Sequence, residues 1–149
     1  MAIASVLQNS FKTELLKGLH SFLASGGSAF KIALYTSSAT IDTTSTAYSA
    51  TNEVASGGGY TTAGEALTNT GVAKSTVTSY TDFSDVSWTS ASFTARGCLI
   101  YNSSTISGLT ANAAVCSIDF GGDKTVSSGT FTIQFPANDS SNAIIRITS

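Results

Sequence analysis

The chain has 149 residues, a formal net charge of -2 and only 11% charged residues. This length is enough for one domain over residues 1–149, because a chain of this size buries roughly two thirds of the surface that it exposes when unfolded. The 7 Lys and Arg residues are scattered singly, which excludes the basic stripe that a nucleic-acid-binding protein needs to neutralise several phosphates.

The N-terminal segment carries no secretory signal, because Gln8, Lys12 and Glu14 interrupt its apolar residues. No apolar run reaches the length of about 18 residues that a membrane-spanning helix needs. We therefore expect a soluble protein that is made in a cytoplasm and has neither a membrane nor a nucleic acid among its partners.

Apolar residues recur at helical spacing over residues 5–24. At about 100° per residue they fall on one stripe, which consists of Leu7, Phe11, Leu15, Leu19 and Phe22. Ser5 can cap the start of such a helix, and Gly26 with Gly27 can end it in a left-handed conformation. The pattern predicts an amphipathic helix whose stripe packs against a sheet or against a neighbouring subunit.

Gly18 lies on the same stripe, in the middle of the predicted helix, where glycine costs about 1 kcal/mol relative to alanine. Such a residue indicates close approach by a neighbour, which is either a bulky side chain of the same domain or a partner protein. His20 lies opposite the stripe and is the only histidine in the chain. We expect it in solvent and not in a metal site.

Residues 30–35 read Phe-Lys-Ile-Ala-Leu-Tyr, in which Phe30, Ile32 and Leu34 alternate with the other three positions. Alternation with a period of two is typical of a strand with one buried face. This half-buried strand is where helical spacing gives way to strand spacing, and we expect the sheet to be built around it.

From Ser37 to Gly64 the sequence is mostly Ser, Thr, Ala and Gly, which predicts a long loop at residues 37–64. Loops longer than about 12 to 15 residues inside a compact domain are usually functional or disordered. Tyr48 and Tyr60 stand alone in this loop, and aromatic side chains with a polar tip suit interfaces. We therefore expect these two tyrosines to dock onto a partner.

The rest of the chain contains short strand-like segments separated by turn residues. They cover residues 66–73, 76–83, 86–95, 98–101, 115–120, 130–135 and 142–148. Together with residues 30–35 they make about eight antiparallel strands, which predict a mainly β fold over residues 29–149. The expected architecture is an antiparallel β-sandwich or jelly roll with the one N-terminal amphipathic helix packed across a face or edge, and an open barrel is the alternative.

Two local features refine these strands. Trp88 and Phe93 are an odd number of residues apart, so they share a face only if a bulge lies near residues 90–92, which we expect. The strand at residues 130–135 alternates regularly until Pro136, the only proline in the chain, ends it.

Cys98 and Cys116 are the only cysteines. If residues 98–101 and 115–120 pair as a hairpin around residues 107–108, the two cysteines lie directly opposite each other. A cytoplasmic origin keeps thiols reduced, and directly opposed strand cysteines make strained disulfides, so we expect two buried thiols instead of a bridge. The CxxC spacing of a zinc or redox site is absent.

The carboxylates Asp82, Asp85, Asp119 and Asp123 lie in turn-like contexts, where Asp often bonds to its own backbone. Nothing in the sequence marks the cleft with stacking aromatics that a paired-carboxylate hydrolase needs, and no calcium-loop pattern surrounds them. We therefore expect no catalytic residue, no metal and no cofactor, and we interpret the protein as non-enzymatic.

The run from Phe30 to Asp42, followed by Thr46-Ala-Tyr48, Asn52-Glu53-Val54 and the Gly-Gly-Tyr-Thr-Thr-Ala-Gly of residues 58–64, resembles small virion proteins of tailed bacteriophages. The resemblance covers residues 29–67. It implies a structural component of a virion that is made in the host bacterial cytoplasm. Among virion roles, a capsid cement or decoration protein fits a small β domain with a protruding helix and a long loop.

In that role we expect the protein to form a homo-oligomer, to bind the major capsid protein on the outside of the shell and to stabilise the shell. The expected interface residues lie on the helix stripe and in the long loop: Leu7, Phe11, Leu15, Gly18, Tyr48 and Tyr60. The alternative is a tail-associated or adhesin-type protein that recognises a host-surface glycan through exposed aromatics such as Tyr48, Tyr60 and Tyr101.

Overall fold

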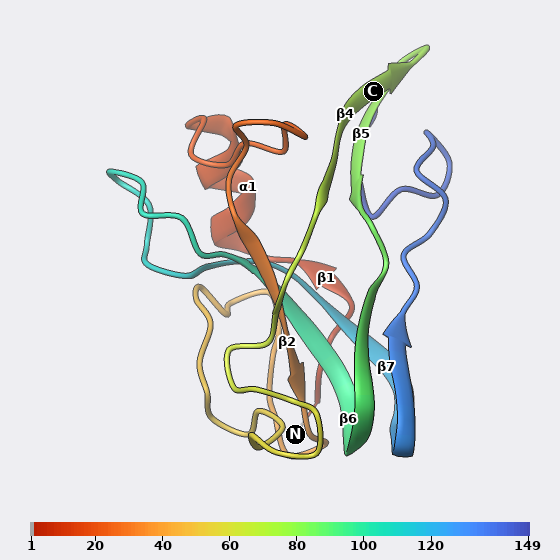
Figure 1. The fold of residues 1–149 in the computed structure, drawn as a ribbon. Helices are drawn as coiled ribbons and strands as arrows, with labels where there is room; N and C mark the ends of the chain where they lie inside the picture. The colour runs from red at the N-terminus through yellow and green to blue at the C-terminus, as the bar shows by residue number, and fades with distance from the viewer. Residues whose placement is uncertain (1) are drawn as a thin grey trace.

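The computed structural model describes residues 2–149. It confirms a mainly β, sandwich-like fold of two antiparallel sheets with one short helix (Figure 1). The elements in chain order are β1 (Val6–Leu7), α1 (Asn9–Leu16), β2 (Phe30–Tyr35), β3 (Glu65–Ala66), β4 (Asn69–Ser75), β5 (Thr78–Phe83), β6 (Val86–Asn102), β7 (Ala113–Ile133) and β8 (Ile145–Ile147). The larger sheet has the strand order β1-β7-β6-β2-β3, and the smaller sheet has the order β4-β5-β8.

Strand β2 pairs with β6 along its whole length and is buried on both faces. Phe30, Ile32 and Leu34 point into the main core, as the alternation predicts. Ala33 and Tyr35 on the other face are also buried, so the prediction of a half-buried strand is wrong. The reason lies in the long loop, which covers this second face.

The loop at residues 37–64 contains no regular strand or helix, but it encloses a second, smaller core on the outer face of β2 and β6. Ala39 and Ile41 of the loop pack there with Leu99, and Ile3 from the N-terminus joins them. Isolated bridges between Ile3 and Ile41 and between Tyr35 and Glu53 fix the loop to the rest of the chain. The loop is therefore a covering layer.

Helix α1 is much shorter than the helix expected over residues 5–24, because the residues at both predicted ends adopt other structures. Val6–Leu7 pair with β7, and the Ser5 hydroxyl accepts a hydrogen bond from the Asp119 N–H, so Ser5 bonds to β7 and caps no helix. At the other end the chain turns at Gly18, whose φ of 73° is left-handed. Gly18 therefore follows the helix instead of interrupting it, and glycine carries no helical penalty there.

Strands β6 and β7 form one long hairpin, and each joins two segments that were predicted as separate strands. The residues between the predicted pieces of β7 read as a turn in the sequence, but they pair with β6 at Phe93↔Val126 and Thr94↔Thr125. Shifts in the pairing register between β6 and β7 accommodate the residues that do not follow a regular strand. Pairing with a neighbouring strand thus overrides the local turn propensity.

The expected bulge in β6 is confirmed. The register shifts on both sides of Ala91, and Ser90 has a φ of 51°. The rings of Trp88 and Phe93 consequently meet edge to face, with centroids 6.4 Å apart and planes at 89°.

Cys98 and Cys116 are buried and free, as expected. The predicted register is off by two residues, however, because Cys98 pairs with Ile118 and Cys116 pairs with Ile100. The two thiols are therefore diagonal neighbours on one face instead of direct partners. Burial raises the pKa of Cys116 to about 12 and raises the pKa of Cys98 further still.

We expect neither thiol to react with Ellman's reagent in the folded protein near pH 8, because disulfide exchange requires an accessible thiolate. Both should react at once when the protein is unfolded in urea. Absorbance of the released thionitrobenzoate measures the number of reactive thiols in each state. Stoichiometric labelling of the native protein within minutes would contradict the buried placement.

Candidate docking surface

The two loop tyrosines that were expected to contact a partner instead bind Glu53 of the same loop. The Tyr48 hydroxyl donates to Oε2 of Glu53 at 2.6 Å, and the Tyr60 hydroxyl donates to Oε1 at 2.6 Å. Oε1 also accepts the Ala63 N–H at 2.8 Å. Glu53 is only 9% exposed, so three internal donors satisfy a buried carboxylate.

The surroundings of these tyrosines leave little for a partner to bind. Tyr60 is 2% exposed, and its oxygen also accepts the Leu34 N–H, which ties the loop to β2. Tyr48 is half-buried and stacks on Tyr101 with ring centroids 4.8 Å apart. Burial, followed by the bond to Glu53, raises the pKa of Tyr48 and of Tyr60 far above the usual value, so both hydroxyls stay protonated donors. The docking role expected for Tyr60 is thus replaced by a structural one.

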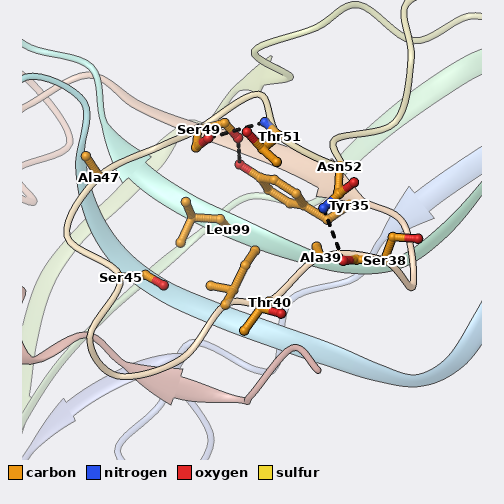
Figure 2. Close-up of a pocket in the computed structure, with 11 residues that line it drawn as sticks. Tyr35, Ser38, Ala39, Thr40, Ser45, Ala47, Ser49, Thr51, Asn52 and Leu99 are labelled. Atoms are coloured by element: carbon orange, nitrogen blue, oxygen red, sulfur yellow. Dashed lines mark hydrogen bonds between the residues drawn. The ribbon is translucent and has the colours of Figure 1, made fainter. Parts of the chain in front are cut away.

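A cavity of about 210 Å³ lies between this loop and the outer face of the sheet. Figure 2 shows the residues that line it. The Tyr35 ring points into it from β2, and its hydroxyl donates to the Ser49 carbonyl at 2.7 Å. The Asn52 amide donates to the Ser38 carbonyl across the rim. Burial raises the pKa of Tyr35 well above its usual range, so the residues that line this cavity supply neutral hydroxyls, an amide and apolar groups.

The structure separates the residues expected on the helix stripe. Phe11 is fully buried in the main core, and Leu7 belongs to β1. Gly18 lies beyond the helix end, and a Cβ there would meet no atom within 4 Å, so no neighbour approaches it closely. Among these residues, Leu15 lines an apolar surface groove and Leu7 lines a more polar one beside Arg146.

His20, expected in solvent, is 6% exposed. Its Nε2 lies 3.0 Å from the Glu14 carboxylate, and its Nδ1 lies 3.0 Å from the Asn102 amide nitrogen. The Asn102 N–H donates to Nδ1, so Nε2 carries the proton that is donated to Glu14. His20 therefore links the end of α1 to the end of β6.

Large apolar side chains that are more than half exposed gather in three segments of the described chain: residues 9–29, 69–83 and 145–149. They are Leu16 (91%), Leu23 (55%), Val72 (57%), Val77 (62%) and Ile147 (58%). We call these three segments the docking end. In Figure 1 they form the upper part of the molecule, where the β4–β5 hairpin projects beyond the rest of the fold.

Contacts hold the three segments of the docking end together. The Asn69 amide donates to the carbonyls of Leu23 and Ser28, at 3.2 Å and 3.1 Å. Strand β8 pairs with β5 at Ser79↔Ile147. An apolar groove of about 110 Å³ lies between α1 and the smaller sheet, and its lining comes from all three segments: Leu15, Phe22, Val72, Ser79, Tyr80, Thr81, Ile145 and Ile147. A cavity of about 150 Å³ holds a benzene molecule, so this groove fits one apolar side chain.

Three exposed lysines lie in the same segments as the exposed apolar residues of the docking end. Lys12 and Lys17 lie at α1 and are exposed, and Lys74 is exposed on β4. Lys74 pairs with Ser79, which in turn pairs with Ile147, so Lys74 shares the groove face of the sheet. None of these lysines forms an ion pair with residues 2–149. The surface is therefore apolar with a positive border.

Sequence reasoning missed Val72, Val77 and Ile147. Of the three, only Val77 has a sequence feature that predicts exposure, because it is a lone apolar residue among polar residues at a hairpin turn. Val72 and Ile147 sit in alternating strands, where an apolar residue reads as a core position. Val72 and Ile147 are exposed because the β4-β5-β8 sheet is small and part of its face stays uncovered, which only the structure shows.

Within the part of the chain that the structure describes, no three His, Cys, Asp or Glu side chains come together in a way that could hold a metal ion. No helix among residues 2–149 has the length and hydropathy needed to cross a bilayer. Comparisons with protein-family models, with curated proteins and with solved structures find no match for this chain.

Proposed function

We propose that this chain is a non-enzymatic structural protein of a bacteriophage virion, of the capsid cement or decoration type. The resemblance of residues 29–67 to small virion proteins supports the class. The observation that carries the role is the docking end, where all five of the most exposed large apolar side chains of residues 2–149 gather. Exposed apolar patches with polar borders are typical of protein interaction sites. The docking end would contact neighbouring subunits, either the major capsid protein or further copies of the chain.

The proposed activity is stabilisation by mass action. A protein that binds the assembled shell but not its free subunits stabilises each site by about 2.7 kcal/mol when its concentration is a hundredfold above Kd. Many sites act together on one shell, so weak individual contacts suffice. This mechanism requires no titrating side chain and no metal.

The structure offers less support for the glycan-binding alternative. That function needs exposed aromatic rings, but Tyr60 and Tyr101 are each 2% exposed and Tyr48 is half-buried. Their hydroxyls already donate to Glu53 and to the Ala63 carbonyl. A sugar would have to displace these internal bonds.

The test compares particles that lack the protein with the same particles after addition of purified protein. We expect the wild-type chain to restore normal occupancy and to raise the temperature at which the particles release DNA. The double variant Val72→Asp, Ile147→Asp should bind at least about tenfold more weakly, because it places charge on the apolar groove. Ser127→Asp, an exposed position on β7 outside the docking end, is the matched control.

Gel densitometry against the major capsid band gives the copy number per particle. Hundreds of copies on the head support the cement role. Equal occupancy of both variants, or a few copies confined to the tail of particles that resist heat equally well without the protein, would refute it.

A further inference from the structure

The described chain carries a second unpartnered apolar surface, whose lining contains no residue of the docking end. It is a groove of about 670 Å³ along β7 and the segment that follows it, here called the β7 groove. Its apolar lining consists of Ile118, Phe120, Phe131, Ile133, Phe135, Pro136 and Ile144. Phe120, Phe131 and Ile133 are only half-buried, so the chain itself leaves this groove open.

The docking end has the complementary shape, because the β4–β5 hairpin projects from the body of the molecule (Figure 1). Val77 lies at its turn and is 62% exposed. Every residue from Val72 to Val77 is exposed, and Lys74 is among them. A projecting arm with an apolar tip and an open apolar groove therefore occur on the same chain.

The charges of the two parts are also complementary. With the buried Glu53 and Asp82 left out, the docking end carries four cations (Lys12, Lys17, Lys74 and Arg146) and one carboxylate (Glu14), a net charge of +3. The remainder carries three cations (Lys31, Arg96 and Lys124) and six carboxylates (Asp42, Glu65, Asp85, Asp119, Asp123 and Asp139), a net charge of -3. The charged residues of the groove lining are Asp119, which pairs with Arg96 at 2.9 Å, and Lys124. Asp85 accepts the N–H of the groove residue Phe135 at 2.8 Å, and the exposed Asp123 precedes Lys124 on β7.

From these observations we infer that the docking end of one copy binds the β7 groove of a second copy, head to tail. The two surfaces differ, so the contact is heterologous: the pair keeps one free groove on the first copy and one free docking end on the second, and further copies can add until a ring closes. This inference rests on the proposed function and deepens it, because it identifies which of the two neighbours named there the docking end binds first: the chain itself. Copies joined in this way would form a continuous layer or ring.

The test is sedimentation velocity of the purified protein from micromolar to millimolar concentration. We expect the mass to rise from the 15.2 kDa of the monomer past that of a dimer, and added salt to weaken the association because it screens exposed charges. An end variant, Lys74→Glu with Val77→Asp, and a groove variant, Asp123→Lys with Gln134→Lys, should each stay monomeric. All four positions are exposed, and unchanged urea midpoints will confirm that both variants fold.

Mixing the two variants is the decisive measurement. The groove variant keeps an intact docking end and the end variant keeps an intact groove, so the equimolar mixture should form a dimer and stop there. A wild-type chain that stays monomeric at millimolar concentration would overturn the inference, and so would a mixture that stays monomeric. A monomeric wild type that still occupies particles through its docking end would leave the proposed function intact, whereas self-association without particle binding would refute only that function.

Discussion

Replacement of Glu53 by alanine is expected to lower the free energy of unfolding by about 3 to 4 kcal/mol. The carboxylate accepts hydrogen bonds from the hydroxyls of Tyr48 and Tyr60 and from the Ala63 N–H. Each buried donor that loses its acceptor costs about 1 to 3 kcal/mol, and the three losses are not additive. Relief of the buried charge offsets part of the cost. Urea denaturation followed by circular dichroism measures the difference.

Two controls make this expectation specific to Glu53. Glu65→Ala removes a carboxylate that is exposed on β3, and it should change stability by less than about 0.5 kcal/mol, as is usual for surface substitutions. Tyr48→Phe removes one of the three hydrogen bonds, at the half-buried end of the cluster, and should cost about 1 kcal/mol. Equal stabilities of Glu53→Ala and Glu65→Ala would show that the loop is held by apolar packing alone.

Gly64→Ala is expected to have a comparable or larger effect, a loss of about 4 kcal/mol or failure to fold. A Cβ on Gly64 would overlap the carbonyl oxygen of Ile32 and lie 2.8 Å from Cα of Ala33. Both are backbone atoms of β2 in the centre of the fold, so neither can move without disturbing the pairing with β6. The φ of 67° adds strain for any residue with a Cβ.

The variant Gly18→Ala separates the steric clash with β2 from the strain of a positive φ. Gly18 has a similar φ of 73°, but a Cβ there meets no atom within 4 Å. This variant should therefore lose only the conformational term, about 1 to 2 kcal/mol. The difference between the two variants in thermal unfolding measures the clash with β2. Equal losses would mean that β2 shifts freely, which contradicts its burial on both faces.

Features of the fold that depend on neighbouring residues could be predicted from the sequence. The alternation of residues 30–35 placed β2 correctly, and the odd spacing of Trp88 and Phe93 predicted the bulge that the structure confirms. The strand expected to run to Phe135 ends earlier, at Ile133, and Pro136 lies in the segment that follows it. For β2 and for the bulge the physical cause lies within a few residues of its effect.

Features that depend on distant partners could not be predicted in this way. The helical spacing of Leu7 and Phe11 is real, but the pairing of Val6–Leu7 with β7 removes the first turn from the helix. The second buried face of β2 depends on a loop that the sequence shows only as polar. Periodicity reports how many faces of an element are apolar, but it does not report which distant segment covers them.

The candidate site shows the same limit. Tyr48 and Tyr60 were recognised as unusual loop residues, but their partner Glu53 is a single carboxylate without a motif around it. Whether an aromatic residue with a polar tip binds another protein or its own chain depends on where that one acceptor lies. Leu15 and Phe22 are the residues of the predicted helix stripe that line the groove of the docking end.

The position of β1 in the larger sheet has a consequence for biosynthesis. Residues 6 and 7 pair with Ser117 and Cys116, and the Gln8 amide bonds to the Ser117 hydroxyl across 109 positions of sequence. Strand β1 is therefore synthesised long before β7 and finds its partner only after the residues between them have been made. Long-range pairing of this kind raises the contact order and slows folding. Until β1 and β7 have paired, the edge of β7 stays open to other nascent chains.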